Sequence, residues 1–420
     1  MKRTSILFIV LMLLNTFAVF AMSTPVTCLL KGRVEKRTSK ALYLMKATTD
    51  PQTINKIRIP IVNNTFEYKL YAEEQEAYQL IFEEELDEMA YKSIIFFPDA
   101  SEIKLTLYPM AEGDDKNSII GGFLNQSYSQ HLKEFSLAFK SSYLMVRQKR
   151  RAAIASKSYY SVAYDSLSLL AKGAEKEKLP LLLIEMFNLQ KNNADLSATG
   201  MAIKLEEQDI LEKMYMKRYA YIKHHSTPVS YYMLYDDFSR HHENAYISKL
   251  SSSAYASLAK AMPEHPYTKK LDYLINGFKL QKGARFVDFK APDLNGKSYQ
   301  LSSVMKGKVT LLNLWASWCG PCISKTREVL PLYHEFKDKG FEVIGVAREF
   351  KDLENLKIAL DREKHPWLTL VDLEDKHMIW NKYGLTNSGG SMVLLDEKGV
   401  ILAINPTAKE LEGILSGILN

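Results

Sequence analysis

A chain of 420 residues, 46% hydrophobic and 25% charged, is longer than one hydrophobic core usually organises, so we expect two or three globular domains. The formal net charge is +6 and the basic residues are spread along the chain, which argues against a nucleic-acid-binding protein. Three cysteines are too few for a fold built on structural disulfides.

The first residues predict an export signal over residues 1–22, which is removed from the mature protein. Lys2 and Arg3 precede an apolar run from Ile6 to Ala21, and small residues end the run at positions suited to cleavage after Ala21 or Ser23. An exported protein enters an oxidising compartment, in which stray thiols form disulfides.

Two alternatives for this N-terminus have less support. An uncleaved membrane anchor would need a longer apolar run than this one, which Asn15 and Thr16 interrupt. A lipid anchor on Cys28 would need aliphatic and small residues before the cysteine, and a position closer to the apolar run. We therefore interpret Cys28 as a small buried hydrophobic residue on a strand.

Short β-rich runs, separated by turn-forming or charged residues, fill the stretch that follows. Alternation of polar and apolar residues in 65–71 and 103–109 indicates half-buried strands, and Asn63-Asn64 is typical of a hairpin turn. We expect a small antiparallel β-sandwich-like domain over residues 24–112. The expected strands are residues 27–34, 41–47, 56–62, 65–71, 77–83, 92–98 and 103–109.

Apolar and tyrosine residues at helical spacing then predict an all-α domain of about six to eight helices over residues 116–280. The tyrosines are interpreted as core and groove residues, with ligand binding as the alternative. The basic run Arg147–Arg151 is interpreted as a solvated helix face. Loops are expected at the helix-breaking residues Gly173, Pro180, Gly200, Pro228 and Pro263.

Glycine, proline and lysine residues around 280–301 mark a boundary, and a third domain is expected over residues 284–420. Strands then alternate with helical patterns, which implies a mainly parallel sheet covered on both faces, with a hairpin added at its edge. Strands are expected at 308–316, 341–347, 367–372, 391–396 and 400–405, and helices at 319–337, 353–364, 377–383 and from Ala408.

Cys319 and Cys322 flank Gly320-Pro321 where the first of these strands passes into a helix. The free amides at a helix N-terminus favour the thiolate of Cys319, which makes it the candidate nucleophile. Cys322 lies one turn further along the same face and is the candidate resolving thiol. Pro321 suits the first helical turn, and Gly320 leaves room for an incoming polypeptide disulfide.

Other roles for this cysteine pair have less support. A zinc site would need two more ligands, and His365 and His377 are isolated in the sequence, so we expect no metal and no cofactor. Two inert structural thiols are the remaining alternative. Of the neighbouring tryptophans, Trp315 suits core packing and Trp318 suits a surface beside the disulfide.

The segment "LLNLWASWCGPC", with "FKAPDLNGKSYQLSSVMKGKV" before it and "KGFEVIGVA", "WNKYGL" and "VLLDEKGVILAI" after it, resembles the thioredoxin-like superfamily. It resembles in particular the exported TlpA/ResA-type thiol-disulfide oxidoreductases. The resemblance implies a thioredoxin fold, a redox-active disulfide, a periplasmic location and membrane-delivered thiol electrons. The β-rich and helical segments resemble an N-terminal extension found on many such proteins of Gram-negative bacteria.

Two departures concern the group that deprotonates the resolving thiol. Thioredoxins place a buried acid six residues before the first cysteine, where this chain has Asn313. ResA-type members commonly place a Glu three residues after the second cysteine, where this chain has Lys325. Lys325 is either a solvated lysine or a cation that stabilises the Cys322 thiolate. Glu349 and Asp352 are weaker candidates for the acid, and Glu328 lies too far along the helix.

A third departure concerns the substrate groove. The family places a cis-proline just before the strand that corresponds to 391–396, facing the cysteines, whereas this chain has Gly389-Gly390. A non-proline cis peptide costs about 3 kcal/mol, so we expect a trans or mobile loop here. The glycines form either a flexible loop or a remodelled substrate groove.

Gly-Pro between the cysteines resembles the reducing members of the family, for which about −270 mV is typical, so we expect a reductase of protein disulfides. The expected partners are a disulfide-containing protein substrate and a membrane-delivered thiol donor, and the sequence assigns no oligomeric state. The alternatives are a weakly active binding module, whose first two domains capture a partner, and a peroxide-reducing thiol protein.

Overall fold

The computed structural model describes residues 25–49, 51, 56–73, 75–88, 90–112, 116–175, 178–242, 244–386 and 389–419. The predicted export signal, residues 1–22, lies outside this part of the chain. None of the helices within it combines the length and the apolar character needed to cross a lipid bilayer.

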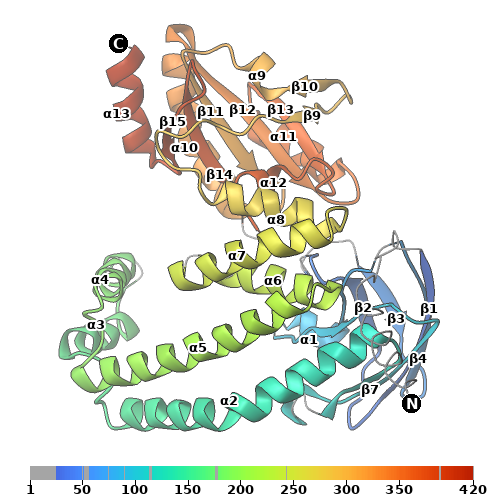
Figure 1. Cartoon of the computed structure of the whole chain (residues 1–420). Helices are drawn as coiled ribbons and strands as arrows, with labels where there is room; N and C mark the ends of the chain where they lie inside the picture. The colour runs from blue at the N-terminus through green and yellow to red at the C-terminus, as the bar shows by residue number, and fades with distance from the viewer. Residues whose placement is uncertain are drawn as a thin grey trace, which may run out of the picture.

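Two four-stranded sheets with the orders β4-β1-β7-β8 and β3-β2-β5-β6 form the N-terminal region (Figure 1). Side chains from both sheets meet in one core, which includes Cys28, Leu42 and Phe96. The seven predicted strands are confirmed. The bounds are β1 Val26–Val34, β2 Ala41–Lys46, β3 Ile57–Pro60, β4 Thr65–Ala72, β5 Tyr78–Phe82, α1 Glu83–Asp87, β6 Ile94–Phe96, β7 Glu102–Leu107 and β8 Ser118–Ile120.

The sandwich differs from the expected one in three respects. β1 pairs with β7 in parallel, whereas the sequence predicted antiparallel strands. The prediction was wrong because alternation indicates which face of a strand is buried and not the direction of the neighbouring strand. β8 is an unpredicted strand on the edge of β7. Asn63 and Asn64 do form a tight turn with positive φ, but β3 and β4 separate into different sheets after a single bridge between Val62 and Thr65.

The described helical region comprises seven helices, in agreement with the sequence. α2 and α5 run antiparallel, since Lys149 pairs with Glu206 while Ser127 hydrogen-bonds Tyr221 at the other end. The bounds are α2 Phe123–Ala155, α3 Val162–Lys172, α4 Leu179–Lys191, α5 Ala198–His224, α6 Pro228–His241, α7 Ala245–Ala261 and α8 Pro266–Gly277.

Gly200, like Pro180 and Pro228, lies in the first turn of a helix and not in the predicted loop. It lies in the first turn of α5, and its amide donates to the Ser197 hydroxyl that caps this helix. A Cβ at Gly200 would lie 2.0 Å from the carbonyl oxygen of Tyr159, so a glycine is required for close backbone approach and not for helix breaking.

Buried contacts join the sandwich to the helices. The Asn125 side chain at the start of α2 accepts from the Phe97 amide at 2.8 Å and donates to the Phe97 carbonyl at 2.7 Å. The buried Tyr267 hydroxyl of α8 accepts from the Ala77 amide at 3.2 Å. These bonds satisfy polar groups that would otherwise be buried without partners.

A five-stranded sheet of order β13-β12-β11-β14-β15 forms the C-terminal region. β11, β12 and β13 are parallel, and the hairpin β14–β15 adds antiparallel strands, as predicted. A short β9–β10 hairpin precedes them and was not predicted. The bounds are β9 Lys290–Pro292, β10 Ser298–Gln300, α9 Leu301–Val304, β11 Val309–Trp315, α10 Gly320–Phe336, β12 Phe341–Glu349, α11 Glu354–Glu363, β13 Leu368–Leu373, α12 Ile379–Lys382, β14 Ser391–Asp396, β15 Ile401–Ile404 and α13 Ala408–Leu419.

The C-terminal region rests on the helical region through α8 and α12 (Figure 1). A Cβ at Gly277 would lie 2.2 Å from the Gly384 nitrogen, so the two backbones are in direct contact. The Lys382 ammonium lies 5.1 Å above the Tyr273 ring beside this contact. Because α12 precedes the Gly389-Gly390 loop, this contact links the helices to the region of the cysteines.

Candidate active site

Cys319 and Cys322 form a disulfide at the start of α10, with their Cα atoms 5.3 Å apart. Cys319 is the N-cap residue, and its Sγ accepts from the Cys322 amide at 3.3 Å. Pro321 occupies the first turn, where a missing N–H leaves no bond unmade. The strand-to-helix transition therefore places the cysteines as the sequence predicts, with exposed fractions of only 6% and 9%.

The Gly389-Gly390 backbone packs directly against the two sulfur atoms. The Gly390 amide donates to Cys322 Sγ at 3.1 Å, and a Cβ at Gly389 would lie 3.1 Å from Cys319 Sγ. A Cβ at Gly390 would lie 1.6 Å from the carbonyl oxygen of Leu314. No described peptide bond is cis. Glycine backbone thus occupies the space beside the disulfide.

Neutral groups support Cys322 from inside the fold. The buried Asn313 amide donates to Thr326 Oγ1 at 3.0 Å, and that hydroxyl donates to the Cys322 carbonyl at 2.8 Å. This chain of hydrogen bonds joins β11 to the first turns of α10. It holds Cys322 in place but carries no charge that could accept a proton.

A buried carboxylate lies on the other side of the site. Glu349 ends β12, and its two oxygens accept from the amide and the hydroxyl of Ser317, both at 2.8 Å. Its exposed fraction is 3%, and burial raises its pKa, although the Ser317 bonds oppose that rise. Ser317 lies two residues before Cys319, so Glu349 is the acidic group bound to the segment that carries the cysteines.

Asp352, the other weak candidate, has a structural task. Its carboxylate accepts from the Glu354 amide at 3.1 Å, at the start of α11, and it lies 4.0 Å from the Lys351 ammonium. Sequence reasoning ranked Glu349 no higher than Asp352. The parallel pairing of β11 and β12 could have favoured Glu349. The carboxyl ends of the two strands lie at one edge of the sheet, so Glu349 at the end of β12 lies near Ser317, which follows β11.

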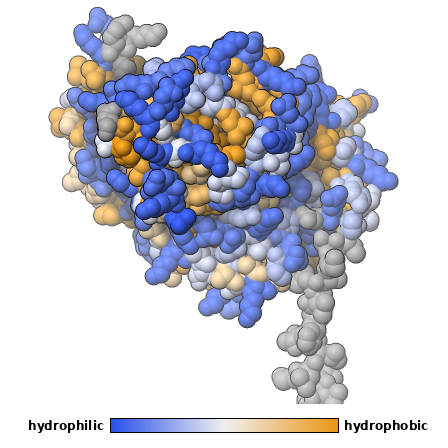
Figure 2. Space-filling model, turned by 90° about the horizontal axis from the view of Figure 1, so that it is seen from above, coloured by the Kyte–Doolittle hydropathy of each residue, from blue (hydrophilic) through white to orange (hydrophobic). Residues whose placement is uncertain are grey.

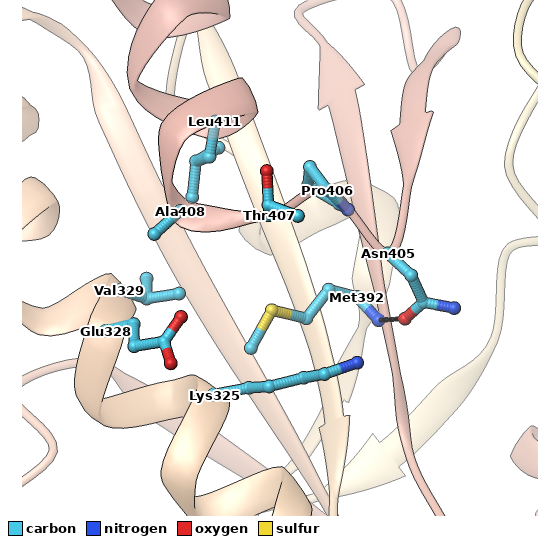
Figure 3. A pocket seen from close by; sticks show the side chains of 9 residues that line it. All are labelled: Lys325, Glu328, Val329, Met392, Asn405, Pro406, Thr407, Ala408 and Leu411. Atoms are coloured by element: carbon cyan, nitrogen blue, oxygen red, sulfur yellow. Dashed lines mark hydrogen bonds between the residues drawn. The ribbon is translucent and has the colours of Figure 1, made fainter. Parts of the chain in front are cut away.

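Lys325 lines a pocket of about 160 Å³ between α10, β14 and the segment that leads into α13 (Figure 3). Its stem lies beside Met392 and its ammonium points toward the Asn405 side. Within the described residues, none of the hydrogen bonds joins Lys325 to a sulfur atom. Glu328 lines the same pocket. The pocket residues are Lys325, Glu328, Val329, Met392, Asn405, Pro406, Thr407, Ala408 and Leu411.

Trp318 lies on the surface beside the disulfide, with an exposed fraction of 49%, whereas Trp315 is fully buried, as the sequence predicts. The Trp318 ring lies 6.1 Å from the Phe350 ring. A Cβ at Gly320 would meet no atom within 4 Å, so the chain is open at this position. An apolar, accessible surface therefore borders Cys319.

Arg348, which sequence reasoning missed, ties together the segments around the site. Its guanidinium forms two bonds with the Asp375 carboxylate, at 2.7 and 2.6 Å, and donates to the Thr386 carbonyl at 3.4 Å. Thr386 lies three positions before Gly389 in the sequence. A charged residue at the end of an apolar strand is a signal for a buried ion pair. The sequence did not identify the partners of Arg348, because Asp375 and Thr386 lie far from it along the chain.

The two histidines are not brought together as metal ligands. His365 lies between Trp315 and Trp367, at ring distances of 5.0 and 5.1 Å, and burial lowers its pKa. The His377 amide donates to Asp372 at 2.9 Å. Among the described residues, no group of three or more His, Cys, Asp and Glu side chains is arranged to hold a metal ion.

Sequence comparison finds relatives of the C-terminal region. The Redoxin family matches residues 281–413. The thiol-disulfide oxidoreductase ResA of Bacillus thuringiensis (strain Al Hakam) is 36% identical over 75 residues, which are 18% of this chain and 43% of ResA. The thioredoxin-like protein YneN of Bacillus subtilis (strain 168) is 33% identical over 136 residues, which are 32% of this chain and 78% of YneN. This chain therefore spans less than half of that ResA but most of YneN.

Two solved structures are similar to the same part of the chain. The thioredoxin domain of a thiol-disulfide oxidoreductase from Bacteroides vulgatus has 28% identity and a TM-score of 0.31, and the match covers 34% of this chain and 100% of that domain. A thiol-disulfide oxidoreductase from Bacteroides fragilis NCTC 9343 has 26% identity and a TM-score of 0.30, with 32% and 100% covered.

Proposed function

This chain belongs to the thioredoxin-like family, through a C-terminal redoxin domain, and on that premise we propose that it is an exported thiol-disulfide oxidoreductase that reduces protein disulfides. The observation that supports this activity is the Cys319–Cys322 disulfide at the N-terminus of α10, with the glycine backbone of Gly389 and Gly390 against its sulfurs. No metal or cofactor is needed for the exchange.

The reaction starts from the reduced dithiol. The Cys319 thiolate attacks one sulfur of a substrate disulfide, which forms a mixed disulfide and releases the other substrate sulfur as a thiolate. Cys322 then loses its proton and attacks Cys319 Sγ. The substrate leaves as a dithiol that has gained two electrons, and the two cysteines, which lost these electrons, are left as the Cys319–Cys322 disulfide. A membrane-delivered thiol donor restores the dithiol.

Backbone amides assist both sulfur atoms. The Cys322 N–H points at Cys319 Sγ, and the Gly390 N–H points at Cys322 Sγ. A hydrogen bond to a charged acceptor is stronger than one to a neutral acceptor, so these donors favour the thiolates that form during exchange. The positive end of the α10 dipole acts in the same direction on Cys319.

Glu349 is the proposed proton acceptor for this site, because Asn313 and Lys325 hold no acid at the two usual family positions. Its carboxylate binds Ser317 of the segment that carries the cysteines. A carboxyl group whose pKa is raised accepts a proton at a pH closer to neutrality than an ordinary one. A water molecule between Glu349 and Cys322 would complete the transfer.

The proposed substrate surface consists of Trp318, the open position of Gly320 and the edge of the Gly389 loop. Trp318 offers an exposed aromatic face, and the missing side chain at Gly320 leaves room for an extended substrate chain beside Cys319. Lys325 lies on α10, three residues after Cys322, and lines the pocket with Met392 and Asn405. We place the protein in the periplasm after removal of residues 1–22. We divide the mature chain at about residues 112–116 and 280–284.

Trapping of a mixed disulfide tests the proposed activity. In a Cys322→Ser variant the intermediate on Cys319 cannot be resolved, so exported protein should carry covalently bound partners that dithiothreitol releases. Cys319→Ser is the matched control and should trap none. Wild-type protein should reduce insulin disulfides. If the Cys322→Ser variant traps nothing and the wild-type protein leaves insulin intact, a docking module without redox activity replaces this proposal.

A further inference from the structure

The helical hairpin formed by α3 and α4 has an unusual surface. It projects at the far end of α2 and α5 from the β-sandwich (Figure 1), and no described side chain of either helix is buried. Hydrophobic residues show at the left margin of Figure 2, the side on which these helices lie in Figure 1. Seven large side chains have exposed fractions between 51% and 85%: Val162, Leu169, Leu170, Leu181, Leu183, Ile184 and Phe187.

The hairpin is held firmly at its base, so this surface is part of the fold. Tyr160 and Leu196 form a bridge, and the Ser161 amide donates to the Asp195 carbonyl at 2.8 Å. Within the hairpin, the Gln190 amide group donates to the Tyr164 hydroxyl at 3.0 Å. Two helices that pack only weakly on their own chain are rarely stable in water, because packing supplies most of the stability of a helix.

We propose that the α3–α4 hairpin is a dimer interface, in which the hairpins of two copies of this chain pack into a four-helix bundle. The outward residues Leu181, Ile184 and Phe187 recur every three positions along α4 and so form one stripe. A two-fold axis would place this stripe against its own copy. Contiguous exposed apolar surface of this kind marks an interaction site in a soluble protein.

Charge and size both suit a second copy. Residues 162–191 contain four lysines and four acidic residues, so two hairpins can approach without net repulsion. α3 has 11 residues and α4 has 13. Taken together, the two helices are similar in size to one side of a standard interface, which contributes about 20–30 residues. Two antiparallel helix pairs are the usual components of a four-helix bundle.

A second copy also fits this surface better than an unfolded client does. Surfaces that bind many clients use flexible methionine-rich or loop segments that can repack. Here the outward residues are leucine, isoleucine and phenylalanine on regular helices, which suit fixed helix–helix packing. The resulting dimer carries two Cys319–Cys322 sites.

Sedimentation velocity of the full mature chain tests the dimer over about a hundredfold range of concentration. The double variant Leu181→Glu/Phe187→Glu should raise the dimer dissociation constant at least about tenfold. Ile358→Glu on α11, where the exposed fraction is 65% as it is for Leu181, is the matched control and should remain dimeric. Unchanged circular dichroism and insulin reduction would show that each variant is folded.

Hydrogen exchange gives an independent readout. Amides of α3 and α4 should exchange more slowly in the wild-type dimer than in the double variant, while α10 amides stay the same. A wild-type chain that is monomeric throughout, or a double variant that still dimerises, would overturn the proposal. So would protection of α3 and α4 that arises only when a reduced and alkylated unfolded protein is added, since the hairpin would then be a client site.

Discussion

The amide of Gly390 donates a hydrogen bond of 3.1 Å to Sγ of Cys322, across 68 positions of the sequence. This bond brings the loop before β14 to the N-terminus of α10. A residue with a side chain at position 390 would collide with the Leu314 carbonyl before the amide could reach the sulfur. The close approach of this backbone to the disulfide therefore depends on glycine.

We predict that Gly390→Ala lowers the free energy of unfolding by about 1–3 kcal/mol and slows insulin reduction, because the added Cβ must push the loop away from Leu314 and Cys322. Urea unfolding and the insulin assay measure the two effects. Gly320→Ala is the matched control for stability beside the same disulfide, and its free energy of unfolding should not fall, since its Cβ meets nothing within 4 Å. Equal behaviour of the two variants would contradict the packing described.

Glu349→Gln should change how stability depends on pH. Because burial raises the folded pKa of Glu349 above its unfolded value of 4.5, this group stabilises the folded state fully below pH 4.5, and that contribution is lost as the pH rises through the folded pKa. The free energy of unfolding of the wild type, relative to that of Glu349→Gln, should therefore fall as the pH rises from 4.5 through the folded pKa of Glu349. Parallel urea unfolding curves of both proteins measure it, and a constant difference would refute the raised pKa.

The same variant separates a role in proton transfer from a structural role. If Glu349 accepts the proton, insulin reduction by the wild type should rise with pH as this carboxyl ionises, and Glu349→Gln should lack that rise and be about tenfold slower near neutral pH. Asp352→Asn, which removes a neighbouring carboxylate, should keep the rise. If the pH profile of Glu349→Gln is parallel to that of the wild type, Glu349 has no role in proton transfer and has only a structural role, through its bonds to Ser317.

Arg348→Met should cost about 3 kcal/mol of stability, because it leaves Asp375 without its bidentate partner and frees the Thr386 carbonyl. The Gly389 loop should loosen with it, so dithiothreitol should reduce the Cys319–Cys322 disulfide faster. Thermal unfolding and the rate of thiol release measure these effects.

The control for that prediction is Arg327→Met. Arg327 also forms a bidentate pair, with Glu363, but its side chain is 61% exposed and Glu363 keeps Arg362 as a second partner. Its loss should cost about 0–1 kcal/mol and leave the rate of disulfide reduction unchanged. Equal losses in the two variants would mean that the position of Arg348 in the site has no special effect.

Gly200→Ala should destabilise the chain by about 1–3 kcal/mol, since its Cβ would overlap the Tyr159 carbonyl at the base of the α3–α4 hairpin. Gly413→Ala on α13 has open space around its Cβ and should gain about 0.5–1 kcal/mol from helix propensity. Urea unfolding should give opposite signs. A stabilised Gly200→Ala variant would contradict the close contact.

Local pattern determined most elements of this protein and the position of its cysteines. Alternation predicted β4 and β7, helical spacing predicted α2 and α5, and the passage from an apolar strand into a helix placed Cys319 and Cys322 together. Each of these features depends on residues within a few positions of one another. Hydrophobic periodicity can therefore predict these features without knowledge of the fold.

Only the tertiary structure decided which distant residues meet. The parallel pairing of β1 and β7, the contact of Gly200 with Tyr159 and the approach of Gly390 to Cys322 all join segments whose separation local periodicity does not record. The selection of Glu349 over Asp352 has the same origin, because a bond to Ser317 exists only once β11 and β12 lie side by side. Side-chain chemistry limits what a residue can do, whereas packing determines its partner.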